Sequence, residues 1–254
     1  MRCLVVIPAR LASTRLNEKL LRRVGGKSIL QHTYESAQRA SIADGVLIAV
    51  DDPRLAAEVE RFGGDCRLTS PECQSGTDRI AEIALLHEDV DVFVNVQGDE
   101  PEIAPETISQ VGQALLANAT ADIATAACPI RTQEQVEDPN CVKVVTGSDG
   151  KALLFSRSPI PYARDGITPG LFSSDPPVFA MHLGIYAYRR DFLLWFAQQP
   201  PSRLEQTERL EQLRALEAGK TIVVTNIDES TPGIDTLEDF HAFEERYRSR
   251  EGAP

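Results

Sequence analysis

The sequence predicts an α/β protein built around a mostly parallel sheet that helices cover. Short apolar runs rich in β-branched residues alternate with helical patterns from residue 4 to residue 127. This order is typical of parallel strands joined by helical crossovers. The first run, Leu4–Ile7, ends abruptly in the polar segment Pro8–Lys19. Ligands of such sheets bind where these loops leave the carboxyl ends of the strands.

Capping residues place the individual elements. Ser28 is an expected N-cap, Pro53 stands at the first position of the next helix, and Ser202 with Glu205 predicts a capping box. The last of these begins a long helix that Gly219 ends. The expected strands cover residues 4–7, 45–50, 66–68, 90–96, 123–127, 181–188 and 221–224, and the expected helices cover 29–40, 53–62, 80–86, 105–116, 191–198, 202–217 and 236–248.

The alternation of strands and helices stops after Cys128. Residues 142–145 and 152–155 flank a glycine-containing turn, which predicts an antiparallel hairpin rather than a crossover. Residues 158–177 are rich in proline and glycine and predict an irregular, exposed segment. Residues 251–254 are expected to fray.

Composition limits the class of protein. The 254 residues carry a net charge of -12, which argues against general nucleic-acid binding. No apolar run has the length of a membrane span, and no signal-peptide pattern precedes the first strand. The five cysteines include no CxxC pair, so the sequence favours free thiols and a cytoplasmic protein.

A basic cluster marks the start of this acidic chain. Seven basic residues and one acid, Glu18, occur in the first 27 positions. A polyphosphate ligand explains the cluster, and a solvated basic face is the alternative. The segment ending in Gly26–Ser28 is not a P-loop, because Leu21 stands where the first glycine is required.

Two aspartates are candidate metal ligands. Asp99 directly follows the expected strand at 90–96, where a carboxylate can bind Mg²⁺ that bridges phosphates. Asp235 precedes the last expected helix. The alternatives are a turn residue for Asp99 and a helix cap for Asp235.

Further polar groups lie at other expected element ends. Gln74–Thr77 is either a base-reading segment or a plain helix cap, and Arg79 faces either a phosphate or solvent. His182 and Tyr186 are four apart in a strand and share a face, for packing or for ligand contact. Glu211 and Gln212 lie on the long helix, whose polar side is otherwise expected to face water.

These segments together resemble the 3-deoxy-manno-octulosonate cytidylyltransferases, also called CMP-KDO synthetases. The resemblance extends in family order from residue 4 to about residue 240. Each segment is short, but the set in register is specific. The segments are Val5–Leu16, Gln74–Arg79, Val94–Pro101, Val142–Val145, Phe155–Arg157, His182–Tyr186, Leu210–Arg214 and Gly233–Thr236.

The resemblance implies a single Rossmann-like nucleotidyltransferase domain over 1–254, with a sugar-binding and dimerisation insertion at roughly 130–200. It implies transfer of CMP from CTP to KDO for lipopolysaccharide biosynthesis, with Mg²⁺ as cofactor, in a cytoplasmic homodimer. The implied catalytic residues are Arg10, Lys19, Asp99 and Asp235, of which Asp99 and Asp235 hold the metal; the implied nucleotide-binding residues are Ala9, Arg10, Arg15, Lys19, Gln74, Ser75, Gly76, Arg79 and Gln97, and the implied sugar-binding residues are Arg157, His182, Tyr186, Glu211 and Gln212.

One departure from the family pattern lies in the first loop. The family usually has Pro-Gly-Lys-Pro where this chain has Asn17–Leu20, so the lysine is kept and the turn residues are lost. Three alternative functions stay open. They are activation of a related sugar acid such as 8-amino-KDO, a glycosyltransferase, whose DxD motif is absent at Gly98–Glu100, and a non-catalytic homologue.

Overall fold

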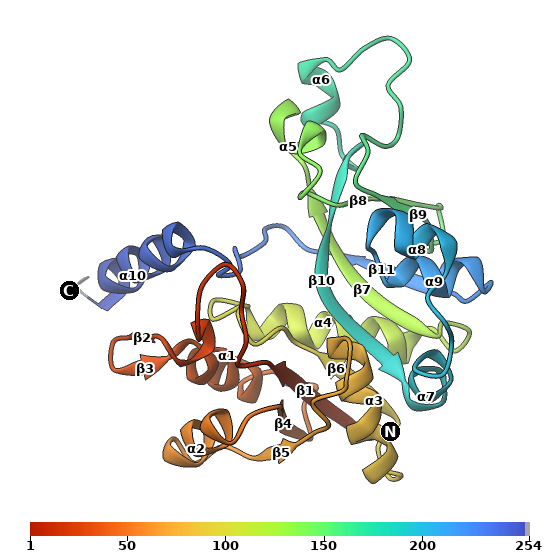
Figure 1. Ribbon diagram of the computed structural model, residues 1–254. Coiled ribbons are helices and arrows are strands. Elements are labelled where there is room, and N and C mark those ends of the chain that lie inside the picture. The colour runs from red at the N-terminus through yellow and green to blue at the C-terminus, as the bar shows by residue number, and fades with distance from the viewer. Residues whose placement is uncertain (252–254) are drawn as a thin grey trace. The chain divides into compact units, whose positions relative to one another are not determined.

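The computed structural model describes residues 1–251 and divides into two compact units (Figure 1). The first unit combines Met1–Ser109 with Thr231–Pro254, and the second is Gln110–Ser230. Fraying was expected over residues 251–254; Glu251 is the last residue of the final helix, and residues 252–254 lie outside the described part. No helix within residues 1–251 is both long and apolar enough to cross a bilayer.

A parallel sheet forms the centre of the first unit. Its strand order is β6-β1-β4-β5, and β1 pairs in parallel with both neighbours. All seven residues of β1 are buried, which fits an apolar strand covered on both faces. The strands are β1 (Cys3–Ala9), β4 (Gly45–Val50), β5 (Cys66–Leu68) and β6 (Val92–Asn95).

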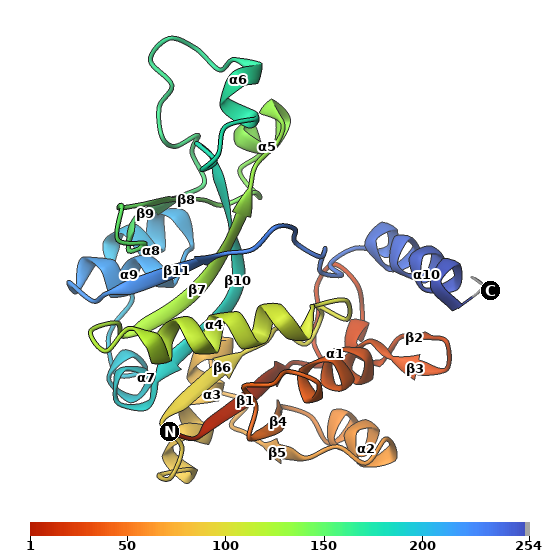
Figure 2. The same cartoon turned by 180° about the vertical axis from the view of Figure 1, so that it is seen from behind.

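Helices cover both faces of this sheet. Right-handed crossovers carry the chain outward through α1 and α2 and then back across β1 through α3, so α1 and α3 lie on opposite faces (Figures 1 and 2). The caps match the sequence: Ser28 accepts from Gln31 N and Asp52 from Arg54 N. The elements are η1 (Lys19–Leu21), the hairpin β2 (Arg23–Val24) and β3 (Lys27–Ser28), α1 (Ile29–Gln38), α2 (Pro53–Arg61), α3 (Gly76–Leu86), α4 (Pro105–Ala117), which contains the boundary between the units, and α10 (Leu237–Glu251).

The start of α10 fixes the position of Asp235. The carboxylate of Asp239 accepts hydrogen bonds from the backbone N–H groups of Asp235 and Thr236, at 3.0 and 2.8 Å. Farther along, Arg246 donates to the buried carboxylate of Glu102 at 2.6 Å, and Tyr247 packs edge-on against His32. The segment before α10 is therefore anchored within the first unit.

The second unit is built on a mixed sheet. β11 pairs in parallel with β7, and β7 pairs antiparallel with β10; the β7 and β10 strands form a long curved ribbon in both views. The predicted hairpin is confirmed, since β8 and β9 are antiparallel. The elements are β7 (Ile123–Pro129), α5 (Gln133–Glu137), β8 (Lys143–Thr146), β9 (Ala152–Ser156), α6 (Pro169–Phe172), β10 (Ala180–Arg189), α7 (Arg190–Phe196), α8 (Arg203–Glu208), α9 (Gln212–Glu217) and β11 (Ile222–Asn226).

The prediction of one long helix over 202–217 is wrong. The capping box of Ser202 and Glu205 forms as expected, but α8 ends at Glu208 and Arg209 adopts a left-handed conformation with φ 53°. The chain turns there before α9 begins.

Candidate functional site

A cavity of about 340 Å³ lies within the first unit, where the carboxyl ends of β1 and β6 meet. Its walls come from the loop after β1, the turn after β6, the first residue of α3 and the segment before α10. We call it the Lys19 cavity. It is lined by Pro8, Arg10, Ala12, Ser13, Thr14, Arg15, Lys19, Leu20, Gly76, Gln97, Gly98, Asp99 and Asp235.

Lys19 joins the two candidate metal ligands. Its ammonium group donates to the carboxylate of Asp99, to Asp235 Oδ1 at 2.9 Å and to the carbonyl of Ile234 at 3.0 Å. All three N–H donors of the ammonium group therefore have partners. Burial by itself lowers the pKa of Lys19, but the two carboxylates outweigh this effect and raise it. The carboxylates of Asp99 and Asp235, which are far apart in the sequence, thus bind the same ammonium group.

The two arginines of the first loop are more exposed than Lys19. Arg15 Nη2 lies 2.8 Å from Asp235 Oδ2 and its side chain is 65% exposed. Arg10 donates to the carbonyl of Cys73 at 2.8 Å and also faces solvent. Ala9 is the buried last residue of β1. The cavity therefore has three cations along one loop, which suits a polyphosphate.

The donor set of this cavity fits Mg²⁺ together with a nucleotide. Among the described residues, no group of three or more His, Cys, Asp or Glu side chains is arranged to hold a metal. Mg²⁺, however, is usually held by one or two carboxylates, waters and substrate phosphates rather than by a full protein cage. Asp99 and Asp235 on one ammonium group provide these two carboxylates. The fit is thus to a metal that arrives with phosphates.

The departure from the family pattern at Asn17–Leu20 changes the residue that occupies a left-handed backbone position. Glu18 adopts a left-handed conformation, with φ 49° and ψ 37°, at the position where the family has glycine. Glycine takes this conformation without strain, whereas other residues rarely do. The carboxylate of Glu18 accepts from Arg54 Nη1 at 2.7 Å, so this acid is already paired with a cation.

The segment Gln74–Arg79 contributes to the cavity mainly through its backbone. Ser75 caps α3 together with Asp78, and the Gln74 amide donates to Glu72 O at 2.8 Å. Gly76 lines the cavity, and a Cβ atom there would lie 3.3 Å from Pro8 Cγ. The capping interpretation of Ser75 is confirmed.

Arg79 faces neither solvent nor the cavity. Its side chain is 1% exposed, and Nη1 bonds to the hydroxyl of Thr69. Nη2 lies 3.7 Å from Asp51, and Asp51 in turn accepts from Leu11 N at 2.9 Å. Arg79 thus connects the ends of β4 and β5 to the first loop. Its buried Nε finds no acceptor among the described residues.

The remaining predicted residue of this side, Gln97, lines the cavity directly after β6. Its amide lies 3.5 Å from Asn95 Oδ1. The small side chains of Ala12, Ser13 and Thr14 also line the cavity and were not among the candidates. The feature of the sequence that could have identified them is the run of small residues between Arg10 and Arg15.

The five implied sugar-binding residues all lie in the second unit, and we call them the β10 group: Arg157, His182, Tyr186, Glu211 and Gln212. The rings of His182 and Tyr186 are 5.4 Å apart, so the expectation of a shared face is confirmed. Burial lowers the pKa of His182 to about 3 and raises that of Tyr186. The charge of Glu211 raises the pKa of Tyr186 further.

A β-bulge shapes this part of β10. The register with β7 shifts between Leu183 and Tyr186, and the buried hydroxyl of Thr125 fills the irregularity by donating to Ile185 O at 2.7 Å. The same hydroxyl lies 2.9 Å from His182 Nε2. Thr125 was not a candidate, because nothing in a strand pattern announces a bulge on its partner.

Gln212 shows the clearest unmet bonding need of the group. The residue is 5% exposed, and its Nε2 finds no hydrogen-bond acceptor among the described residues. Buried amide groups normally have partners. The Nε2 group of Gln212 is therefore a donor that the described residues leave open for a partner outside the chain.

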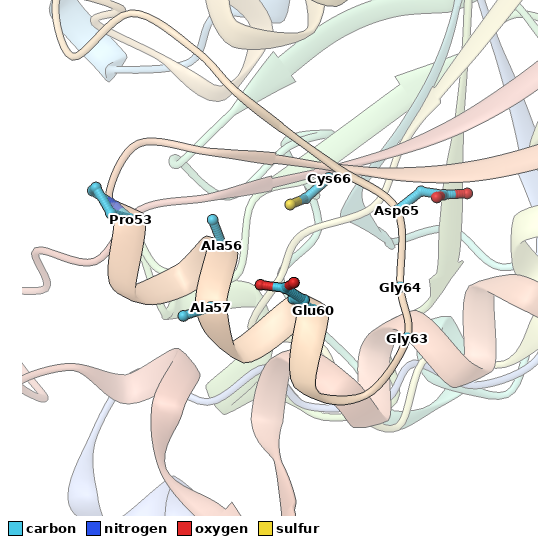
Figure 3. A pocket seen from close by; sticks show the side chains of 8 residues that line it. All are labelled: Pro53, Ala56, Ala57, Glu60, Gly63, Gly64, Asp65 and Cys66. Carbon is cyan, nitrogen blue, oxygen red and sulfur yellow. The ribbon is translucent and has the colours of Figure 1, made fainter.

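A second hollow lies beside the edge strand β5, away from these candidates. Figure 3 shows Glu60 and Cys66 directed into it from α2 and β5, with Asp65 turned away. Pro53, Ala56, Ala57, Gly63 and Gly64 complete its wall. Nothing in this hollow offers a cationic or metal-binding set, so it is not a candidate for the same ligand.

Comparisons with known proteins agree on one family. The sequence model of the family described as cytidylyltransferase matches residues 4–222. A 3-deoxy-manno-octulosonate cytidylyltransferase from Rhodopirellula baltica is 63% identical over 98% of this chain and 100% of its own length. A protein of the same name from Pelobacter propionicus is 47% identical over 96% of each chain.

The fold comparison gives the same result. A CMP:2-keto-3-deoxy-manno-octonic acid synthetase solved in complex with CTP superposes with a TM-score of 0.90 at 37% identity, over 98% of this chain and 100% of that one. A cytidylyltransferase from Leptospira borgpetersenii, at 15% identity and a TM-score of 0.62, shares the fold. The predicted nucleotidyltransferase fold is thereby confirmed, and the glycosyltransferase alternative receives no support. The chain belongs to the cytidylyltransferase family, in the group of the 3-deoxy-manno-octulosonate cytidylyltransferases.

Proposed function

We propose that this protein is the enzyme that activates 3-deoxy-D-manno-octulosonate (KDO) with CTP, giving CMP-KDO and pyrophosphate for lipopolysaccharide biosynthesis. Full-length relatives of up to 63% identity carry that activity in their names. The observation that carries the proposal is the meeting of Lys19, Asp99 and Asp235 in a cationic cavity. A triphosphate needs cations and metal-binding carboxylates in the same place.

The proposed reaction is a displacement at phosphorus. The anomeric hydroxyl oxygen of KDO forms a bond to the α-phosphorus of CTP. The bond from that phosphorus to the oxygen that bridges the α- and β-phosphates breaks, pyrophosphate leaves, and the hydroxyl proton passes to solvent. Such a reaction needs alignment and charge neutralisation more than covalent help from the protein. Arg10, Arg15 and Lys19 are positioned along one loop to neutralise the phosphates.

Asp99 and Asp235 are the residues that would hold Mg²⁺. The bound ion would neutralise phosphate charge and lower the pKa of the attacking hydroxyl. Lys19, which bonds to both carboxylates in the free protein, keeps them together before the nucleotide binds. No histidine of the chain is needed as a base in this scheme.

The β10 group is the proposed sugar site. Arg157 suits the carboxylate of KDO, because a guanidinium group binds carboxylates through two parallel hydrogen bonds. The orphaned amide of Gln212 suits a sugar hydroxyl. Two neighbouring rings, His182 and Tyr186, provide an uncharged wall at neutral pH.

We also propose a cytoplasmic homodimer. All five cysteines are free thiols, as a reducing compartment requires. β9 pairs only with β8 among the strands within residues 1–251, and Leu153 and Leu154 on β9 are 64% and 39% exposed. Apolar side chains on an open strand edge suit contact with a second copy. A Leu153→Lys variant that stays dimeric in light scattering would remove this surface from consideration.

The activity is tested by pyrophosphate release from CTP in the presence of Mg²⁺ and KDO. We expect release that depends on all three components and falls sharply when UTP or ATP replaces CTP. Equal rates with the three nucleotides, or no release with any sugar acid, would refute the proposal. An 8-amino-KDO arm at matched concentration decides between KDO and its amino analogue by the ratio of kcat/KM values.

A further inference from the structure

The carboxylate of Glu208 binds the end of β9 at the residue that precedes Arg157 and at Arg157 itself. Glu208 is the last residue of α8. Its Oε1 accepts from Ser156 Oγ at 2.8 Å and its Oε2 accepts from Arg157 N at 2.5 Å. Its backbone carbonyl accepts from Arg157 Nε at 2.7 Å. One residue therefore contacts both the main chain and the side chain of Arg157.

Lys143 binds the backbone carbonyl of Arg157, whereas Glu208 binds its backbone N–H. The Lys143 side chain is fully buried and donates to Arg157 O at 2.6 Å and to Asp138 O at 2.9 Å. The guanidinium Nη1 of Arg157 donates to Pro139 O at 2.8 Å. Two of the three guanidinium nitrogen atoms are thus fixed, which sets the plane of the group and the direction of the third.

Glu208 is also close in sequence to two other residues of the β10 group, Glu211 and Gln212. After Glu208 the chain turns through Arg209, in its left-handed conformation, and reaches Glu211 and Gln212. The same turn places the orphaned Nε2 of Gln212 in the protein interior. Glu208 therefore joins the end of β9, which Arg157 directly follows, to the turn that leads to Glu211 and Gln212.

We propose that Glu208 is a positioning residue for the sugar acid: it contacts no substrate, but it fixes Arg157 relative to Glu211 and Gln212 so that the site matches a carboxylate-bearing sugar. This inference rests on the proposed function of the β10 group. Packing of α8 on α9 does not require Glu208, because Glu205 already joins these helices by accepting from Arg214 at 2.5 and 2.7 Å.

The first experiment replaces Glu208 with glutamine and measures KM separately for each substrate. Glu208→Gln keeps the size of the side chain but removes the charge that accepts from Arg157 N. We expect KM for KDO to rise about tenfold or more, the usual effect of weakening a charge-assisted hydrogen bond. KM for CTP is expected to stay within about twofold. An unchanged KM for KDO would overturn the inference.

Glu205→Gln is the matched control. It removes a buried carboxylate one turn earlier on the same helix, and this carboxylate pairs with Arg214 instead of Arg157. We expect it to lower the melting temperature while leaving both KM values near those of the unchanged protein. If Glu205→Gln raised KM for KDO as much as Glu208→Gln, the effect would belong to helix packing and the positioning role would be refuted.

A double-mutant cycle separates positioning from independent contact. With Arg157→Met already in place, adding Glu208→Gln is expected to raise KM for KDO no further, because the group to be positioned is gone. Multiplying effects would contradict the inference. Should Glu208→Gln fail to fold, Ser156→Ala removes one bond to the same carboxylate, and we expect a rise of roughly threefold.

The unchanged protein distinguishes this inference from the proposed function. If it releases no pyrophosphate from CTP with KDO, the proposed function fails. If it is active and Glu208→Gln has the same KM for KDO, only the positioning role of Glu208 fails.

Discussion

In the Lys19 cavity the candidate functional side chains bond to one another. In the β10 group, residues that are not themselves site candidates hold Arg157 and His182 in place. Lys19 uses its whole ammonium group on Asp99, Asp235 and one carbonyl. Arg157 and His182 are held instead by Glu208, Lys143 and Thr125. The first site thus stabilises itself in the free protein, and the second leaves a donor of Gln212 unmet. Substitutions in the two sites should therefore change stability in opposite directions.

The largest effect is expected from Asp99→Asn. The change keeps the shape of the side chain but removes the charge that Lys19 bonds to and that the proposed Mg²⁺ would require. Turnover is expected to fall by about a hundred- to a thousandfold, the usual range for losing one preorganised electrostatic group. Circular dichroism should show an intact fold. Turnover within a few fold of the unchanged protein would mean that Asp99 is not a metal ligand.

Lys19→Met is expected to destabilise the first unit as well as to abolish turnover. It leaves two carboxylates side by side without their shared cation, which should cost about 1–3 kcal/mol in the free energy of unfolding. Urea unfolding measures the change. Arg10→Met is the control, since Arg10 lines the same cavity but, among the described residues, hydrogen-bonds to the Cys73 carbonyl and to no carboxylate. Equal stability of the two variants would contradict the account of a self-stabilised cavity.

Gln212→Met is expected to stabilise the protein, in contrast to Lys19→Met. Methionine has a similar volume and no buried donor, so the free energy of unfolding should rise by about 1 kcal/mol. KM for KDO should rise as well, and KM for CTP should not. Gln206→Met, at an exposed position of α8, provides the control for the substitution itself. A less stable Gln212→Met protein would show that the amide is satisfied in the free state.

Acid should act on the two units over different pH ranges. The folded-state pKa of His182 is lowered to about 3 by burial, so its contribution is present above its unfolded pKa of about 6.5 and is lost as pH falls from there. For Glu58 in α2, burial raises the pKa, but bonds from Arg61, Ser28 and Arg23 outweigh it and lower the pKa to about 2. Its contribution is lost only below the unfolded pKa of about 4.5.

His182→Gln therefore tests the upper part of this range. Between pH 6.5 and 5, unfolding of the unchanged protein should take up as much as about one proton more than unfolding of His182→Gln. The urea midpoint of the unchanged protein should therefore fall more steeply as the pH falls. Glu58→Gln should follow the unchanged protein in this range and depart from it only below about pH 4.5. Parallel curves for His182→Gln and the unchanged protein would show that His182 is not kept neutral by burial.

The smallest effects concern Glu18 and Arg209, the non-glycine residues in residues 1–251 that adopt the left-handed conformation, one in each unit. Arg209→Gly should raise the free energy of unfolding by roughly 0.5 kcal/mol, because the relief of strain slightly exceeds the entropy that glycine loses on folding. Glu18→Gly should gain less, because it also removes the bond to Arg54. Thermal unfolding of both variants measures the difference. A larger gain for Glu18→Gly would reverse the comparison.

The sequence predicted more of the candidate site in the first unit than in the second. Strand ends and a cluster of cations predicted the loop that carries Lys19, and Asp99 was found by its position after a buried strand. The meeting of Asp99 with Asp235 needed the three-dimensional structure, because the two are far apart in the chain. In the second unit, Glu208 and Thr125 act through a helix break and a bulge that the hydrophobic pattern does not encode. The break at Arg209 was missed because nothing in the pattern marks arginine as a turn residue.

The fully engaged ammonium group of Lys19 has a consequence for selectivity among anions. To touch a phosphate oxygen, this lysine must release a carboxylate, so an incoming anion replaces an existing ion pair. An anion that arrives without its own cation leaves Asp99 and Asp235 facing each other uncompensated. Free inorganic phosphate or sulfate is therefore expected to gain little from Lys19, so that without a metal an isolated small anion would be left to the more exposed Arg10 and Arg15.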